Sequence, residues 1–249
     1  MDNRRLIIIG AVVLLAMVVF ELYADYFITY TEYKPNALTN LNVGPLQLTD
    51  YYKDGENIGT YTSTVEVKNQ TLGEITYTIS SKTDLIYQEK HQTVDTILTI
   101  TDRMRLLDYK VSASINDISS TTTVTMKGSN ANVTNTFMGD TITLNVNIPE
   151  NTIVMDHSQP AHWELLVRSF NFELGKRYRV NVFIPQTASI HSWELGADQN
   201  LQTISIGGVS YTCLVVRQAD MDIQFYVSNG ALIRYRDQIN NIVIEKKPG

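Results

Sequence analysis

Residues 141–148 read TITLNVNI, an unbroken alternation of polar and apolar side chains over eight positions. Successive side chains of a β-strand point to opposite faces of its sheet, so this pattern predicts a strand with one covered face. The side chains expected to face a core are Ile142, Leu144, Val146 and Ile148. An antiparallel sheet with one covered face is the simplest arrangement that uses such a strand.

The same alternation recurs along the chain. It places the following residues on single faces of further strands: Ile75, Tyr77 and Ile79; Tyr109, Val111, Ala113 and Ile115; Tyr178, Val180, Val182 and Ile184; and Ile223, Phe225 and Val227. Gly207 with Gly208, and Asn229 with Gly230, separate strand-like runs, and these dipeptides readily adopt the positive φ of tight hairpins. The C-terminal third therefore reads as a meander.

One segment interrupts the strands. Residues 160–170 bring four apolar side chains to helical spacing: Trp163, Leu166, Val167 and Phe170. Pro160 near the first turn and Gly175 beyond the end favour a short helix. We expect its apolar stripe to pack against the sheet.

The N-terminus predicts a membrane segment. Arg4 and Arg5 precede an apolar stretch, and residues 6–24 would span about 28 Å as a helix, close to the thickness of a bilayer core. A cleaved signal peptide and an uncleaved anchor both fit such a stretch. Leu22 is bulky where a peptidase site needs a small residue, and no cysteine is present here to take a lipid. We therefore expect an uncleaved anchor with Arg4 and Arg5 in the cytoplasm.

This interpretation divides the chain into four parts. Residues 1–5 form a cytoplasmic tip, residues 6–24 a transmembrane helix, residues 25–50 a linker containing Pro35, Gly44 and Pro45, and residues 51–249 an extracytoplasmic β-domain. The expected location is the cytoplasmic membrane, crossed once, with the bulk of the chain in the periplasm or outside the cell. Asn69 and Asn132 begin glycosylation sequons, which are usable only if the chain meets the right machinery.

Composition excludes several classes of function. A formal charge of −6 over 249 residues, with no basic stripe, argues against a nucleic-acid partner. Cys213 is the only cysteine, so neither an internal disulfide nor a CxxC zinc site can form, and we interpret it as a small core residue. No phosphate-binding loop, GxSxG elbow or acylation signature occurs, so we expect no cofactor and assign no enzymatic activity.

Some polar residues nevertheless gather in the sequence. Asp156, His157, His162 and Glu164 lie close together and include ligand types that zinc accepts. His157 and His162 are five apart and straddle Pro160, so they do not share a helical face, and a surface turn before the helix explains them better than a metal site.

Two further pairs of residues could act as acid and base. His191 and Glu194 suggest an acid–base pair, but we expect a loop around the buried Trp193. Asp220 and Asp222 are expected to be solvated hairpin charges. No catalytic, metal-binding or ligand-binding residue is assigned.

Five segments of the chain resemble one known family. They are residues 172–178 (FELGKRY), 182–186 (VFIPQ), 208–213 (GVSYTC), 229–235 (NGALIRY), and Gly59 with the alternating run 61–68. In this order the chain resembles the exported DUF3108-like proteins over most of residues 50–247. The resemblance implies an extracytoplasmic, strongly curved antiparallel sheet akin to the lipoprotein-carrier and lipocalin-like half-barrels. It offers no catalytic residues, and the apparent anchor departs from that family's plain signal peptide.

The combined prediction is a mainly β fold: a curved antiparallel sheet or half-barrel with one short helix near 160–170, preceded by a single transmembrane helix. Its favoured role is an interaction or scaffold module of the cell envelope that binds another envelope protein. The alternative is a carrier of a lipid or another apolar ligand, and an enzyme is the least favoured reading. A carrier needs an unfilled apolar pocket, whereas an interaction module needs an exposed apolar patch.

Overall fold

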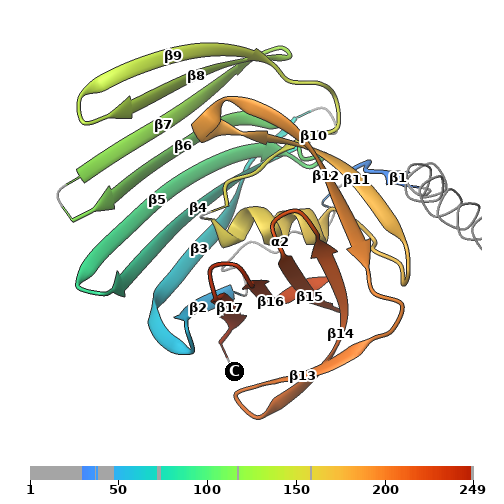
Figure 1. Cartoon of the computed structure of the whole chain (residues 1–249). Coiled ribbons are helices and arrows are strands. Elements are labelled where there is room, and N and C mark those ends of the chain that lie inside the picture. The colour runs from blue at the N-terminus through green and yellow to red at the C-terminus, as the bar shows by residue number, and fades with distance from the viewer. Residues whose placement is uncertain are drawn as a thin grey trace, which may run out of the picture. The chain divides into compact units, whose positions relative to one another are not determined.

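A computed structural model describes residues 30–36, 38, 48–71, 74–116, 118–157 and 159–247, with the backbone alone for residues 69–71 (Figure 1). The expected cytoplasmic tip and transmembrane helix, and much of the expected linker, lie outside the described residues. Within the described residues, no helix has the length and apolar character needed to cross a bilayer.

The described part of the chain is mainly β, with one short α-helix, as predicted. The first strands are β1 (Thr31–Glu32), β2 (Leu48–Lys53), β3 (Glu56–Thr71), β4 (Glu74–Tyr87), β5 (Lys90–Thr101), β6 (Leu106–Ile115), β7 (Ile118–Lys127), β8 (Asn130–Phe137) and β9 (Asp140–Asn147). The later elements are β10 (Thr152–Val154), the helix α2 (Pro160–Arg168), β11 (Arg177–Ile184), the 3-10 turn η2 (Pro185–Thr187), β12 (Ser189–Ala197), β13 (Gln202–Ile206), β14 (Val209–Gln218), β15 (Ile223–Ser228), β16 (Ala231–Asp237) and β17 (Ile242–Lys246).

These strands form one curled sheet in the order β1-β10-β11-β12-β13-β14-β15-β16-β17-β2-β3-β4-β5-β6-β7-β8-β9. Two antiparallel meanders, β11 to β17 and β2 to β9, are joined where β17 pairs with β2. Short β10 runs parallel to β11. The sheet is open, because its strand order begins and ends on different strands. A hydrogen bond of 3.0 Å from Asn135 Nδ2 on β8 to the carbonyl of Gln186 in η2 bridges the curl.

Both predicted hairpins are confirmed. Gly207 and Gly208, with φ of +55° and +82°, connect β13 to β14. Asn229 and Gly230, with φ of +51° and +72°, connect β15 to β16. Two successive positive φ values match the right-handed twist of the flanking strands, which is why Gly and Asn are favoured at these positions.

The predicted helix is confirmed, but its surroundings differ from the prediction. Helix α2 begins at Pro160 and ends at Arg168, and every side chain from Pro160 to Val167 is buried. Figure 1 shows the reason: the sheet curls around α2, so strands cover the helix on several sides. The helix is therefore buried on all sides, and not along one apolar stripe as predicted.

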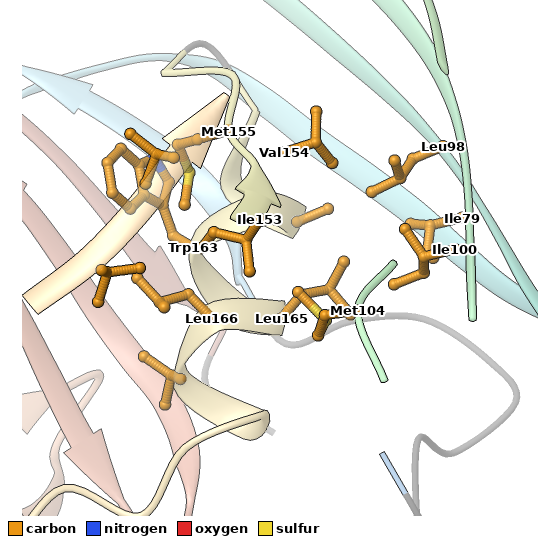
Figure 2. Packing of buried hydrophobic residues seen from close by; sticks show 14 of the residues in the cluster. Ile79, Leu98, Ile100, Met104, Ile153, Val154, Met155, Trp163, Leu165 and Leu166 are labelled. Carbon is orange, nitrogen blue, oxygen red and sulfur yellow. The ribbon is translucent and has the colours of Figure 1, made fainter. Parts of the chain in front are cut away.

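The core lies between the helix and the concave face of the sheet. Figure 2 shows Ile79, Leu98 and Ile100 of β4 and β5 pointing toward β10 and Leu165 of α2. On another side of the helix, the Trp163 ring lies 5.5 Å from Trp193, 5.0 Å from Phe225 and 5.4 Å from Tyr235, measured between ring centroids. Aromatic side chains bury large areas, so this cluster is a main source of stability.

The stretch at residues 141–148 contains a strand with the predicted alternation, but only two of its four apolar side chains reach the core: Ile148 is buried and Val146 packs against the core. Ile142 is 62% exposed and Leu144 44%, whereas Ile148, just past the strand, is buried. Strand β9 is the last of its meander and pairs with β8 only among the described strands. The pattern correctly assigned a shared face, but in the described part of the chain that face stays exposed at Ile142 and Leu144.

Part of the segment expected to be a linker packs with the domain. The compact unit begins at Glu32, and the side chains of Tyr33, Leu38 and Leu48 are buried. Tyr33 shares a hydrogen bond of 2.6 Å with Ser169, and Tyr77 donates one of 2.8 Å to the Leu38 carbonyl. These contacts tie the segment to α2 and β4.

Candidate functional site

Three of the four polar residues that gather around the start of the helix, Asp156, His162 and Glu164, are buried, which corrects the expectation of a surface turn for them, whereas His157 is exposed. Asp156 accepts a hydrogen bond from the Tyr109 hydroxyl. The Nδ1 atom of His162 lies 3.1 Å from the Val154 carbonyl oxygen and 3.2 Å from the Asp156 nitrogen. Burial lowers the pKa of His162 and raises the pKa of Tyr109 well above its ordinary value. The curl brings these groups inside because the segment before α2 enters it.

The other two members of the group point elsewhere. Glu164 is buried one helical turn before Arg168, and its Oε1 atom forms an ion pair with the Arg168 Nη2 atom at 2.6 Å. The His157 ring lies 5.7 Å from Trp163 and 5.2 Å from Trp193. Among the described residues, no three His, Cys, Asp or Glu side chains are placed to hold a metal ion.

A second polar cluster anchors the start of the helix to the sheet. Gln159 Oε1 accepts hydrogen bonds from Ser81 at 2.8 Å and Thr96 at 2.9 Å, and the backbone nitrogen of Ala161 donates to the Tyr61 hydroxyl at 3.1 Å. Buried polar groups are stable when they are paired. We interpret these contacts as structural, because they hold α2 inside the curl.

The remaining candidate pairs separate. His191 Nε2 lies 2.8 Å from Ser189 Oγ, and Glu194 pairs with Arg179 at 3.1 Å. Both belong to strand β12, so the expected loop is wrong, although Trp193 is buried as predicted.

Asp220 and Asp222 are exposed in the turn between β14 and β15, as expected for hairpin charges. Gln218 Nε2 donates to Asp220 at 3.1 Å, and Gln238 Nε2 donates to Asp222 at 2.7 Å.

A cavity opens between the β4–β5 hairpin and strands β15 to β17. Its volume is about 400 Å³, within the range of small-molecule sites. Its lining residues are Tyr51, Thr83, Leu85, Gln92, Val94, His157, Asp220, Met221, Ile223, Tyr235, Asp237, Ile239, Asn240, Ile242 and Ile244. His157 is thus the one residue of the predicted polar group that reaches this cavity.

The cavity walls are mainly apolar, with polar groups at particular points. Burial raises the pKa of both Tyr51 and Tyr235, so these phenols are neutral donors at physiological pH. Thr83 is buried, and its hydroxyl makes no well-formed hydrogen bond in the described part of the chain, although it lies close enough to Tyr51 to lower that phenol's pKa slightly against the larger effect of burial. Partial desolvation also lowers the pKa of His157, although the residue keeps an exposed edge.

A second feature is an exposed apolar patch on the concave face of β6 to β9. We call it the concave patch and define it as Ile115, Ile118, Phe137, Ile142 and Leu144. Leu144 pairs with Val133, and Val133 with Val124, both core residues, so the pairing places Leu144 on the face that curls around α2. Ile142, Phe137, Ile118 and Ile115 follow on the same face through the registers of β6 to β9.

The five residues of the concave patch are uncharged, and Asp140, which pairs with Phe137, places one carboxylate on the same face at the hairpin end of β9. The five side chains of the patch are each between 44% and 62% exposed, and the residues between them on the same face, such as Ala113, Ser120 and Asn135, are uncharged. Contiguous exposed apolar surface on a folded domain commonly marks a binding site. The patch borders the free edge of β9.

Three other predicted residues are also placed. Cys213 is fully buried in a small cluster with Val215 and Tyr226, which agrees with its interpretation as a core residue. Asn132 is exposed on β8, and Asn69 lies in β3, where the side chain is outside the described part.

Sequence reasoning assigned no ligand-binding residue and missed the cavity. A signal was present, because Ser81 and Thr83 interrupt the apolar series of Tyr77, Ile79 and Leu85 on the inward face of β4. Polar residues at inward positions indicate either internal hydrogen bonds or a site. Much of the remaining wall comes from residues 220–244, more than one hundred residues away, so no local pattern could reveal it.

The fold and these features define a domain built from one curled antiparallel sheet around a central helix. No protein-family model matches the chain, and no curated protein is similar to it in sequence. In structure it is similar to a β-barrel-like protein of the domain of unknown function DUF1849 from Brucella abortus, with a TM-score of 0.46, 11% identity, and coverage of 82% of this chain and 96% of that one. It is also similar to a DUF1089 family protein from Pseudomonas aeruginosa, with a TM-score of 0.38, 8% identity, and coverage of 70% and 88%. The resemblance to the DUF3108-like proteins stays a prediction.

Proposed function

We propose that this chain is a membrane-anchored binding module of the cell envelope, which presents its curled sheet outside the cytoplasm and binds an extended segment of a partner protein along β9. The observation that carries the proposal is the exposed apolar concave patch beside an open strand edge. Binding, and not catalysis, is the proposed role, because the buried Asp156 and His162 serve internal contacts away from the cavity lining.

The edge strand has the features of a site for strand addition. Natural proteins protect free edges with lysines, prolines or bulges, since an unprotected edge pairs with other strands. Residues 141–147 of β9 contain no charge and no proline, and the register with β8 is unbroken from Asn130–Asn147 to Phe137–Asp140. The outer backbone groups of such a strand can pair with an extended peptide.

The concave patch gives this pairing its selectivity. A strand added to β9 would place every second side chain on the concave face beside Ile142 and Leu144. Apolar side chains at those positions would remove the patch from water, and polar side chains would face outward beside Thr141 and Thr143. We therefore expect a partner segment that alternates apolar and polar residues.

The anchoring part of the proposal is supported by the apolar residues 6–24 behind Arg4 and Arg5. We expect the chain to remain with membranes after carbonate extraction. Protease added to spheroplasts should digest residues beyond 30, whereas a tag placed before Arg4 should survive. A soluble chain, or a protected C-terminal domain, would overturn this part of the proposal.

The partner is tested by site-specific photo-cross-linking in cells. A photoreactive residue at Ile142, on the concave face, should capture one protein repeatedly, and the same residue at Thr143, on the opposite face of the strand, should capture it far less. The captured protein is then purified, and its addition should slow hydrogen exchange of the β9 amides. Equal capture at both positions, capture of lipid only, or unchanged exchange would contradict strand addition.

Matched variants complete the test. Leu144→Lys places a charge within the concave patch, and Thr143→Lys places the same charge on the other face of the same strand. Both positions are exposed, so both variants should fold. We expect Leu144→Lys to weaken partner binding about tenfold or more and Thr143→Lys to change it little.

A further inference from the structure

The 400 Å³ cavity lies apart from the concave patch and has a chemical asymmetry of its own. One part of its wall is formed by aliphatic side chains: Leu85, Val94, Ile223, Ile242 and Ile244. Val94, Ile223 and Ile244 belong to the buried core, so this wall is rigid. It offers a surface against which an alkyl chain of a few carbons can lie.

The rim of the cavity is acidic. Asp220 and Asp237 are among its lining residues, and no lysine or arginine is. Asp220 accepts a hydrogen bond from Gln218, and Asp237 accepts bonds from the backbone and side-chain nitrogens of Asn240. In the described part of the chain neither carboxylate forms an ion pair.

Basic groups near the rim do not balance these charges. Lys53 donates a 2.9 Å hydrogen bond to the Asn240 carbonyl and lies 5.3 Å above the Tyr87 ring, so it contributes one positive charge against the two carboxylates. Two aromatic side chains, Tyr51 and Tyr235, line the same space, and aromatic faces attract cations. An anionic head group would meet net repulsion here, and a cationic one net attraction.

From this arrangement we infer that the cavity binds a small aliphatic amine, whose alkyl chain lies against the Val94, Ile223 and Ile244 wall and whose ammonium group lies at the Asp220 and Asp237 rim. The inference goes beyond strand addition at β9, and it excludes fatty-acid carboxylates as the preferred ligands. Its success or failure is independent of the concave patch, because the two sites share no residue.

A ligand series with a constant chain and a variable head group tests the inference. n-Hexylamine, n-hexanol and n-hexanoate are titrated calorimetrically at pH 7 into the full chain reconstituted in nanodiscs, with empty nanodiscs as the blank. We expect hexylamine to bind about tenfold more tightly than hexanoate, with hexanol between them. Hexanoate binding as tightly as hexylamine, or no heat from hexylamine beyond the blank, would overturn the inference.

A second experiment reverses the charge of one carboxylate at the rim of the cavity. Asp220 lies in an exposed turn, so Asp220→Lys should leave the fold intact, which circular dichroism checks. We expect this variant to lose the preference for hexylamine and to gain affinity for hexanoate. Asp140→Lys makes the same change of net charge in the exposed β8–β9 hairpin and should keep the wild-type order. The same response to both variants would show that net charge, and not the rim, sets the preference, and would count against the site.

Discussion

Gly59 of strand β3 lies against the backbone of β4, opposite Leu85. Its φ of +154° is one that other residues rarely adopt, and a Cβ atom at this position would come within 2.0 Å of the Asp84 carbonyl oxygen. Because the obstacle is backbone and not a flexible side chain, the strand itself would have to move. The backbone therefore requires glycine at this position.

We therefore predict that Gly59→Ala lowers the free energy of unfolding by about 2 kcal/mol or more, measured by equilibrium urea unfolding. Gly196→Ala is the control, because nothing lies within 4 Å of its Cβ position in β12. It should change stability by less than about 0.5 kcal/mol. Equal effects of the two substitutions would show that the close approach at Gly59 is not real.

His162 makes stability depend on pH. Burial lowers its pKa in the folded state below the ordinary value of 6.5, so the unfolded chain binds a proton more readily than the folded one. Stability is then fully present above about pH 6.5 and decreases as the pH falls below it, by up to about 1.4 kcal/mol per pH unit. His157, whose pKa is also lowered, adds a loss of the same sign.

Urea unfolding at pH 7.5 and 5.5 measures this loss. His162→Gln should reduce the difference between the two pH values, even if it lowers stability at both. His191→Gln, at an exposed position of β12, should change the difference much less, through its charge interaction with His157 alone. A wild-type stability that is the same at both pH values would contradict a buried neutral imidazole.

The helix α2 occupies the centre of the hydrophobic core, inside the curled sheet. Leu165 is fully buried at its centre, and Figure 2 shows it directed toward Met104 and the β5 side of the core. Leu165→Ala would leave a cavity where the sheet cannot collapse. We predict a loss of about 2–5 kcal/mol in the free energy of unfolding.

Leu174→Ala is the matched control, since Leu174 is 48% exposed in the loop after α2. It should cost less than about 0.5 kcal/mol. If Leu165→Ala proved as mild as this control, the helix would not be the packed centre of the domain.

Elements also show how far local sequence determines this fold. The alternation in β9, the glycines of the two hairpins and Pro160 of α2 all act within a few residues, and each was predicted correctly. What covers each face depends on residues distant in the chain. The sequence pattern therefore predicted that Ile142 and Leu144 are buried, whereas both are exposed. It also predicted a surface turn at Asp156 and Glu164, whereas the curled sheet buries both side chains. The cavity was missed for the same reason, because Val94 and Ile223 come to line one space only when the sheet curls.

At the scale of the whole domain, one ladder joins the two meanders. Strand β17 pairs with β2, which brings residues 242–246 beside residues 48–53. Ile244, opposite Tyr51, is part of the core and of the cavity wall. Without β17, both β16 and β2 would become free edges and the core would open to water.

We predict that deletion of residues 239–249 abolishes cooperative unfolding and makes both meanders sensitive to protease. Deletion of residues 247–249 keeps the β17–β2 ladder and should preserve the wild-type urea midpoint. Retention of that midpoint by the longer deletion would show that the ladder is dispensable.

The position of α2 between the two meanders has a consequence for synthesis. Strands β2 to β9 leave the ribosome before residues 160–168, and β11 to β17 follow them. When the first meander emerges, its inward apolar side chains, including Ile79 and Leu98, are exposed to water. They remain exposed until α2 has been synthesised and packs against them. A nascent chain paused near residue 155 would therefore be prone to aggregate, and we expect chaperones to bind it.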